Sequence, residues 1–204
     1  MVLTQRFEDA LAYAAHLHSQ QVRKASNVPY IAHLMGVTSL VLDYGGDEDE
    51  AVAALLHDAV EDQGGQAQRA EIARRFGERV AVIVDDCSDT NVIPKPPWRA
   101  RKEAYLAHLP TVSDSARLVS AADKLHNVRS ILLDFRQVGE TVWERFNGGR
   151  EGTLWYYRAL TDTYKRLGAM PLVAELDRAV TELEALAGSG PQGAALSAPD
   201  LTSR

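Results

Sequence analysis

The amino-acid sequence predicts an all-α fold. Nearly every long segment repeats apolar residues at the three- and four-residue spacing of an amphipathic helix, and convincing β-strand alternation is absent. Glycines and prolines separate these segments by short connections. The length of 204 residues, with 46% hydrophobic and 25% charged residues, suits one globular domain with a single core.

The first helices follow from clear start and stop signals. Thr4 is a suitable N-cap for a helix that extends to His18. Pro29 interrupts the next stretch, and a helix over residues 34–44 then ends at a pair of glycines. Residues 47–60 predict another helix, because their first turn is acidic and a helix dipole favours negative charge there.

The rest of the chain continues in the same way, apart from one loop and one tail. Residues 91–98 contain three prolines, which exclude a regular helix and predict a loop. We expect residues 1–187 to form the domain and residues 188–204, rich in Gly, Ser and Pro, to form a disordered tail. The further predicted helices cover residues 66–76, 78–87, 99–109, 113–137, 153–167 and 171 to about 186.

Charge and cysteine content restrict the partners and the compartment. The chain has 22 Lys and Arg against 28 Asp and Glu, a formal net charge of −6, which argues against binding nucleic acid or an anionic membrane. No apolar run has the length of a membrane span. A single cysteine, Cys87, rules out an internal disulfide and fits a reducing cytoplasm, so we expect a cytoplasmic protein. The sequence leaves a homo-oligomer open.

The segment His57-Asp58-Ala59-Val60-Glu61-Asp62 is the strongest sign of chemistry. On a continuous helix, positions 57 and 61 share one face, and positions 58 and 62 share the adjacent one. Three carboxylates and an imidazole would then crowd together near a helix C-terminus, where the dipole disfavours negative charge. Crowded carboxylates repel one another unless a positive group lies among them. The segment therefore predicts a divalent cation.

Two residues elsewhere in the chain can complete a metal site. His33 opens a predicted helix, and Asp123 lies within an apolar helix where an unpaired carboxylate would be costly. Together with His57 and Asp58 they supply two imidazoles and two carboxylates from three helices. This mixed ligand set suits Mn, Fe, Co or Zn better than Ca or Mg. A bound divalent metal acidifies water and neutralises phosphate charge, and a nearby carboxylate can accept the proton.

At these residues the chain resembles the HD-domain metal-dependent phosphohydrolases. The resemblance is closest to the hydrolase domain of SpoT/RelA proteins and the stand-alone small alarmone hydrolases, and it covers roughly residues 5–168. Four motifs carry it: Arg23-Lys24, Pro29-Tyr30-Ile31-Ala32-His33, His57-Asp58-Ala59-Val60-Glu61-Asp62 and Ala122-Asp123-Lys124-Leu125-His126-Asn127.

The resemblance implies an all-helical hydrolase, usually loaded with Mn²⁺, that removes the 3′-pyrophosphate from the nucleotide (p)ppGpp. By position, it makes His33, His57, Asp58 and Asp123 the metal ligands. Glu61 and Asp62 match the pair that positions and activates the attacking water. The resemblance places the remaining candidates, Arg23, Lys24, Asn127 and Ser130, against the nucleotide.

Two alternatives stay open. The chain could be an HD phosphohydrolase for another nucleotide, such as a dNTP, a nucleoside monophosphate or NADPH. It could also be a non-catalytic HD module that senses a nucleotide. The Glu61-Asp62 pair beside a complete ligand set favours an enzyme.

Blander roles are expected for other reactive side chains. His126 is expected to point elsewhere on its helix and to pack, and Cys87 to be a small buried residue. Lys95 and Arg99 fit contacts with substrate phosphates and a solvated loop about equally well.

Overall fold

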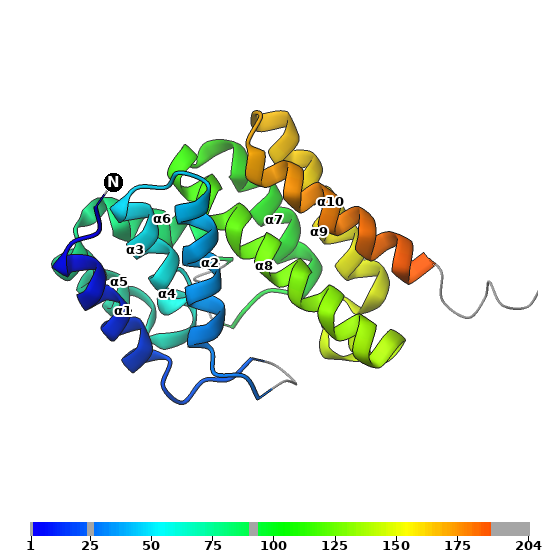
Figure 1. Cartoon of the computed structure of the whole chain (residues 1–204), viewed down its shortest axis with the longest axis horizontal. Helices are drawn as coiled ribbons and strands as arrows, with labels where there is room; N and C mark the ends of the chain where they lie inside the picture. The colour runs from blue at the N-terminus through cyan, green and yellow to red at the C-terminus, as the bar shows by residue number, and fades with distance from the viewer. Residues whose placement is uncertain (1, 24–26, 90–93, 189–204) are drawn as a thin grey trace, which may run out of the picture.

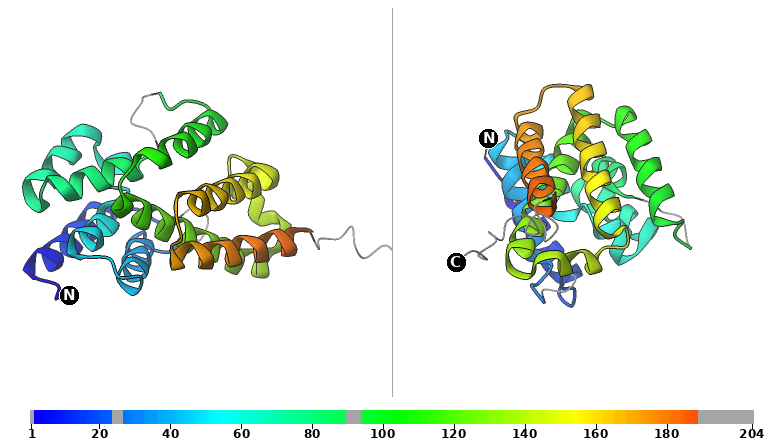
Figure 2. Two further views of the ribbon diagram at one scale, coloured as in Figure 1. Left: turned by 90° about the horizontal axis from the view of Figure 1, so that it is seen from above. Right: turned by 90° about the vertical axis from the view of Figure 1, so that its right-hand side faces the viewer.

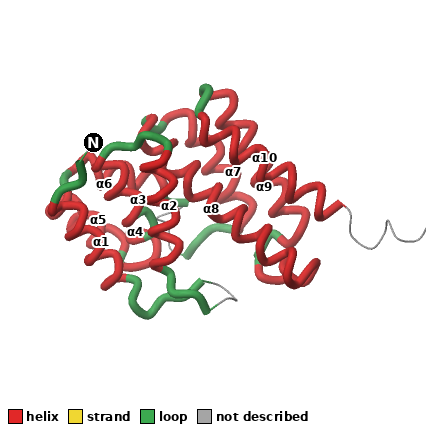
Figure 3. Tube along the Cα trace, in the orientation of Figure 1, coloured by secondary structure: helices red, strands yellow, loops and turns green. Residues whose placement is uncertain are grey.

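Helices joined by loops make up the part of the chain that the structure describes (Figure 1 and Figure 3). This computed structural model describes residues 2–23, 27–89 and 94–188, and within them the only β pairing is an isolated bridge between Val22 and Pro29. The prediction of an all-α fold is confirmed. The helices are Gln5–Leu17 (α1), Ile31–Asp43 (α2), Glu48–Leu56 (α3), Ala59–Gln63 (α4), Gly65–Phe76 (α5), Glu78–Cys87 (α6), Trp98–His108 (α7), Asp114–Val138 (α8), Gly149–Leu167 (α9) and Pro171–Gly188 (α10), with short 3₁₀ turns at Leu109–Thr111 (η1) and Gly139–Arg145 (η2).

The long helix α8 lies at the centre of the arrangement. Helices α2, α3 and α6 pack against its first half, and α9 and α10 pack against it from the other side (Figure 1). Seen from above, α7 lies apart from the α8–α10 pair and alongside α9 (Figure 2). The helices bury one continuous apolar core, which includes Leu34, Leu55, Leu125 and Leu160. Side chains on α2, α3, α7 and α8 can therefore meet near the middle of the molecule.

Side-chain caps explain where several helices begin. Thr4 accepts a hydrogen bond from the Arg6 amide at 3.3 Å, as expected of an N-cap. Asp47 and Glu50 form a capping box, in which each side chain accepts from the other residue's backbone amide. Ser113 caps α8 by accepting from the Ala116 amide at 3.1 Å. These boundaries agree with the sequence pattern to within a few residues.

The prediction of one continuous helix over residues 47–60 is wrong. Helix α3 ends at Leu56, and α4 begins at Ala59. His57 Nδ1 lies 2.8 Å from the Ala54 carbonyl oxygen, the acceptor that a continuing helix would offer to the Asp58 amide. The imidazole thus competes with the backbone, and the chain turns at the two residues of the His-Asp pair.

The described residues extend to the end of α10 at Gly188. Of the predicted tail over residues 188–204, Gly188 instead belongs to α10, and residues 189–204 lie outside the described residues, as does Lys24. None of the described helices combines the length and the apolar character that crossing a membrane requires.

Candidate metal centre and nucleotide cleft

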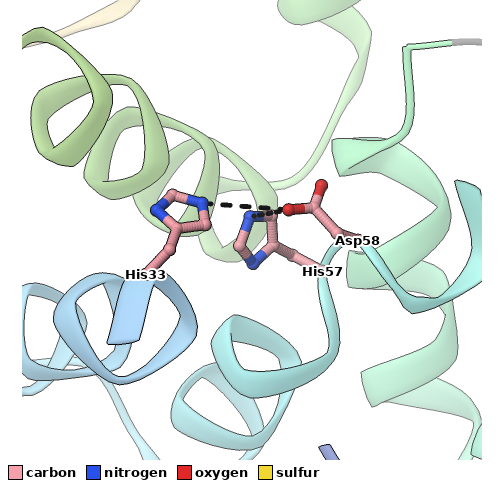
Figure 4. A group of neighbouring side chains, drawn as sticks. All are labelled: His33, His57 and Asp58. Carbon is pink, nitrogen blue, oxygen red and sulfur yellow. Dashed lines mark ion pairs between the residues drawn. The ribbon is translucent and has the colours of Figure 1, made fainter. Parts of the chain in front are cut away.

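Three of the predicted metal ligands lie close enough to share one ion. His33 comes from the first turn of α2, and His57 and Asp58 come from the turn between α3 and α4 (Figure 4). One ligand atom from each lies within 4.8 Å of the others. Asp58 Oδ2 is 3.0 Å from His57 Nε2 and 3.8 Å from His33 Nε2. The turn that ends α3 therefore directs two neighbouring side chains at the same point.

Asp123 of α8 lies beside this group. Its Oδ1 is 3.2 Å from His33 Nε2 and 3.7 Å from His57 Nε2. The carboxylate is buried, and it accepts hydrogen bonds from Lys124 Nζ and Asn127 Nδ2, both at 2.5 Å. The structure thus brings all four side chains that the sequence nominates as ligands into one cluster from three parts of the fold, with Asp58 partly exposed and the other three buried.

The protonation of the two histidines fits a metal. His57 Nδ1 is placed to donate its proton to the Ala54 carbonyl, which leaves the lone pair on Nε2. That Nε2 is buried and has no hydrogen-bond partner among the described residues, although Asp58 is near. Burial lowers the pKa of His33, so the His33 imidazole is neutral and able to bind a cation.

The two carboxylates call for a positive charge between them. Burial opposes ionisation of Asp58 and Asp123, but the nearby His57 and Lys124 outweigh it and hold both carboxyl pKa values low. Burial also lowers the pKa of His57, yet the two carboxylates raise it overall. In the protein alone, a proton on His57 would supply the missing charge. A divalent cation satisfies the same demand more fully.

Two side chains that the sequence analysis did not nominate support the cluster. Tyr30 donates from its hydroxyl to Asp58 Oδ2 at 2.6 Å. His126 Nδ1 lies 2.9 Å from His33 Nδ1, so the expectation that His126 points elsewhere is wrong. Burial lowers the pKa of His126 to about 4, and the neutral ring can accept a hydrogen bond. Gly36 is the sequence feature that could have indicated this contact. A glycine inside a helix often permits a close approach by a neighbouring helix, and His126 lies directly against Gly36.

Glu61 and Asp62 lie on α4, one turn beyond the ligands. Lys95 Nζ bonds Glu61 Oε1 at 2.7 Å, and Gln21 Nε2 donates to Asp62 Oδ2 at 2.8 Å. Burial raises the pKa of Asp62, and the neighbouring Asp58 and Glu61 raise it further. A raised pKa suits a carboxylate that exchanges protons near neutral pH.

Both carboxylates face a cleft with two lobes that meet at Asp58, Glu61 and Asp62. The first lobe has a volume of about 380 Å³. Three predicted substrate residues line it, and Arg23 Nη2 donates to Asn127 Oδ1 at 3.0 Å. The full lining consists of polar side chains with apolar ones between them: Gln21, Val22, Arg23, Tyr30, Asp58, Glu61, Asp62, Asn127, Ser130, Ile131, Asp134, Arg145, Phe146 and Tyr157.

The second lobe, of about 480 Å³, carries most of the basic side chains. Lys95, Arg101, Lys102 and Lys124 all line it, and Arg145 lines both lobes. Of these five, the sequence analysis gave only Lys95 a possible contact with substrate, since basic residues on helices also occupy ordinary solvated faces. Cys87 lines this lobe and is partly buried, and burial raises the pKa of its thiol.

Sequence comparison finds a matching family and similar proteins. A family model described as an HD domain matches residues 10–154. Guanosine-3′,5′-bis(diphosphate) 3′-pyrophosphohydrolase MESH1 of Xenopus tropicalis is 41% identical over 126 residues, which cover 60% of this chain and 68% of that protein. The Homo sapiens protein of the same name is 37% identical with the same coverage.

Two solved structures are also similar to this chain in fold. The structure of a metazoan ortholog of SpoT that hydrolyzes ppGpp and plays a role in starvation responses has a TM-score of 0.75 at 26% identity, covering 91% of this chain and 99% of that chain. The structure of lmo0812 from Listeria monocytogenes EGD-e has a TM-score of 0.66 at 28% identity, covering 74% and 97%. The region matched by the family model contains all four side chains of the cluster.

Proposed function

The chain belongs to the HD-domain family, and on that premise we propose that it is a metal-dependent hydrolase that removes the 3′-pyrophosphate from guanosine-3′,5′-bis(diphosphate). The MESH1 relatives that carry this activity in their names support the choice of nucleotide. The single observation that carries the proposal is the buried His57 Nε2, which has no hydrogen-bond partner among the described residues and lies 3.0 Å from Asp58, a carboxylate that lines both lobes of the cleft.

We assign His33, His57, Asp58 and Asp123 as the ligands of one divalent transition metal. Mixed imidazole and carboxylate ligation suits Mn, Fe, Co or Zn better than Mg or Ca, and we infer Mn²⁺ from the resemblance to HD hydrolases that are usually loaded with it. When bound, the metal would polarise the scissile phosphate and lower the pKa of the attacking water. The chain itself supplies the orientation of both imidazoles, through Ala54 for His57 and His126 for His33.

Glu61 and Asp62 would orient and deprotonate the attacking water. Neither belongs to the ligand cluster, and both face the junction of the lobes. Asp62, with its raised pKa, is suited to accept the proton of the attacking water. Glu61 is held in place by Lys95 and by the Asp89 amide at 3.3 Å, so it is suited to orient that water.

The first lobe would hold the nucleoside. Arg23 offers a flat guanidinium that can stack on a purine, and Phe146 and Tyr157 offer apolar surface. Asn127 and Ser130 add polar groups, although Asn127 already bonds Arg23 and Ser130 Oγ bonds the His126 carbonyl at 3.0 Å. We retain Lys24 as a nucleotide contact on the resemblance alone, since it lies outside the described residues.

The partner implied by this site is a small nucleotide. We infer a cytoplasmic location from the single cysteine, which fits a reducing compartment.

A nucleotide panel tests the proposal. The Mn²⁺-loaded protein is incubated with ppGpp, dNTPs, nucleoside monophosphates and NADPH, and products are identified by mass. We expect ppGpp to give the highest kcat/KM. Cleavage of another nucleotide without ppGpp would leave an HD phosphohydrolase of different specificity. Binding of ppGpp without cleavage of any nucleotide would indicate a sensing module. Glu61→Gln serves as the matched inactive control.

A further inference from the structure

Two largely buried cations on the wall of the second lobe share a single carboxylate. Arg101 and Lys102 both bond the same oxygen, Asp89 Oδ2, and all three side chains are largely buried. Lys124 is paired with Asp123, a carboxylate already committed to the metal cluster. Buried cations are costly unless they are paired, and two cations on one carboxylate leave a charge unmatched.

Of the two cations that share Asp89, Lys102 is the one without a hydrogen bond to the described part of the loop before α7. Arg101 has a structural role, because its Nε also donates to the Pro96 carbonyl at 3.1 Å and so holds the loop before α7. One cation is enough to neutralise Asp89, and Arg101 supplies it. Lys102 Nζ, 2.9 Å from Asp89 and 4.8 Å from the centre of the Tyr156 ring, adds a positive charge that the fold does not require.

Close packing of α7 against α9 places Lys102 in the lobe. Trp98, the first residue of α7, rests on Gly148 and Gly152 at the start of α9. A Cβ atom at Gly148 would lie 2.6 Å from the Trp98 ring, so only glycine permits this approach. The packing of Trp98 against these glycines places Arg101 and Lys102 of α7 on the wall of the same cavity that reaches Asp58 and Asp123.

We propose that this lobe is the subsite for the 3′-pyrophosphoryl group and for the inorganic pyrophosphate that it becomes, with Lys102 as its principal cation. The inference rests on the proposed function. Water attacks the phosphorus attached to the 3′ oxygen, and the bond between these two atoms breaks. The 3′ oxygen takes a proton, and the pyrophosphate keeps the oxygen of the water. The nucleoside then lies in the first lobe, and the most highly charged product lies among the cations.

Binding of inorganic pyrophosphate tests the subsite without relying on catalysis. Pyrophosphate is titrated calorimetrically into the Mn²⁺-loaded protein at fixed free Mn²⁺, with a matched titration into buffer to subtract chelation. We expect Lys102→Met to bind pyrophosphate about tenfold or more weakly, and Lys102→Arg to restore most of the affinity. GDP, titrated in parallel, should bind Lys102→Met as it binds the unmodified protein.

Arg99→Gln is the matched control on the same helix. Arg99 stacks over Trp155, bonds Glu103, and lines neither lobe as described. Its loss should leave pyrophosphate affinity unchanged. Unchanged pyrophosphate affinity in Lys102→Met, or an equal loss of GDP affinity, would overturn the assignment. Failure of the proposed function looks different: pyrophosphate would still bind through Lys102, but no ppGpp would be hydrolysed.

Discussion

His33 Nδ1 and His126 Nδ1 lie 2.9 Å apart, so one imidazole supports another beside the candidate metal site. Only one of two facing nitrogens can carry the proton of the hydrogen bond. If His33 offers Nε2 to a metal, its Nδ1 carries the proton, and His126 must accept it. Gly36 makes the contact possible, because a Cβ there would lie 2.3 Å from His126 Nε2.

Removing the acceptor should weaken metal binding. We predict that His126→Phe lowers Mn²⁺ affinity about tenfold or more, as loss of a ligand's hydrogen-bond partner usually does. Gly36→Ala should have a similar effect, because the added methyl group displaces His126. Direct Mn²⁺ titration measures both, with His16→Phe at an exposed site as the control. Wild-type Mn²⁺ affinity in both His126→Phe and Gly36→Ala would show that His126 does not support metal binding through His33.

Metal content and stability should change together. The assigned ligands come from α2, the α3–α4 turn and α8, so a bound ion ties these elements together. We predict about one transition-metal ion per chain in purified protein, and its loss in His57→Ala. Chelation should lower the melting temperature of the unmodified protein but leave that of His57→Ala unchanged. Full metal content in the variant would contradict the ligand assignment.

Binding and chemistry should separate at the Glu61-Asp62 pair. Glu61→Gln and Asp62→Asn keep the side-chain size but remove a carboxylate, and neither residue is an assigned ligand. We predict unchanged metal content and similar ppGpp affinity in both, with kcat lower by about a hundredfold or more. Steady-state kinetics and metal analysis check this. Near wild-type kcat in both variants would mean that these carboxylates do not act on the water.

The raised pKa of Asp62 gives a pH dependence of defined sign. Folding favours the protonated carboxyl, so stability from this group is present below the unfolded-state pKa. It is lost as the pH rises through the higher folded-state pKa. In metal-free protein, Asp62→Asn should therefore be more stable than wild type at pH 7, and the difference should shrink towards pH 4. Urea unfolding across this range measures it. A variant that is less stable at pH 7 would show that Asp62 is not a destabilising charge.

The sequence was sufficient to predict that the four nominated ligand side chains lie together, but not that Tyr30 and His126 contact them. Helical periodicity identified the elements, and His33, His57, Asp58 and Asp123 stood out because histidines and carboxylates at these apolar positions are costly without a partner. The helix break at His57 was not predictable, because it depends on the imidazole taking the Ala54 carbonyl from the backbone. The spacing of apolar residues gives no information on competition between a side chain and the backbone for one carbonyl.

Contacts between distant helices were also beyond the sequence. His126 faces His33 only because α2 and α8 approach closely at Gly36. Lys102 lies in the cleft only because Trp98 seats α7 on the start of α9. In the sequence alone, a lysine on a cleft wall and a lysine on a solvated helix face give the same pattern.

The position of bond cleavage in ppGpp tests the central claim most directly. The Mn²⁺-loaded protein is incubated with ppGpp, and the phosphorus NMR spectrum and product masses are followed with time. We predict GDP and inorganic pyrophosphate as the first products, formed in equal amounts and absent with Glu61→Gln. Release of inorganic phosphate as the first product, or recovery of intact ppGpp, would contradict the account.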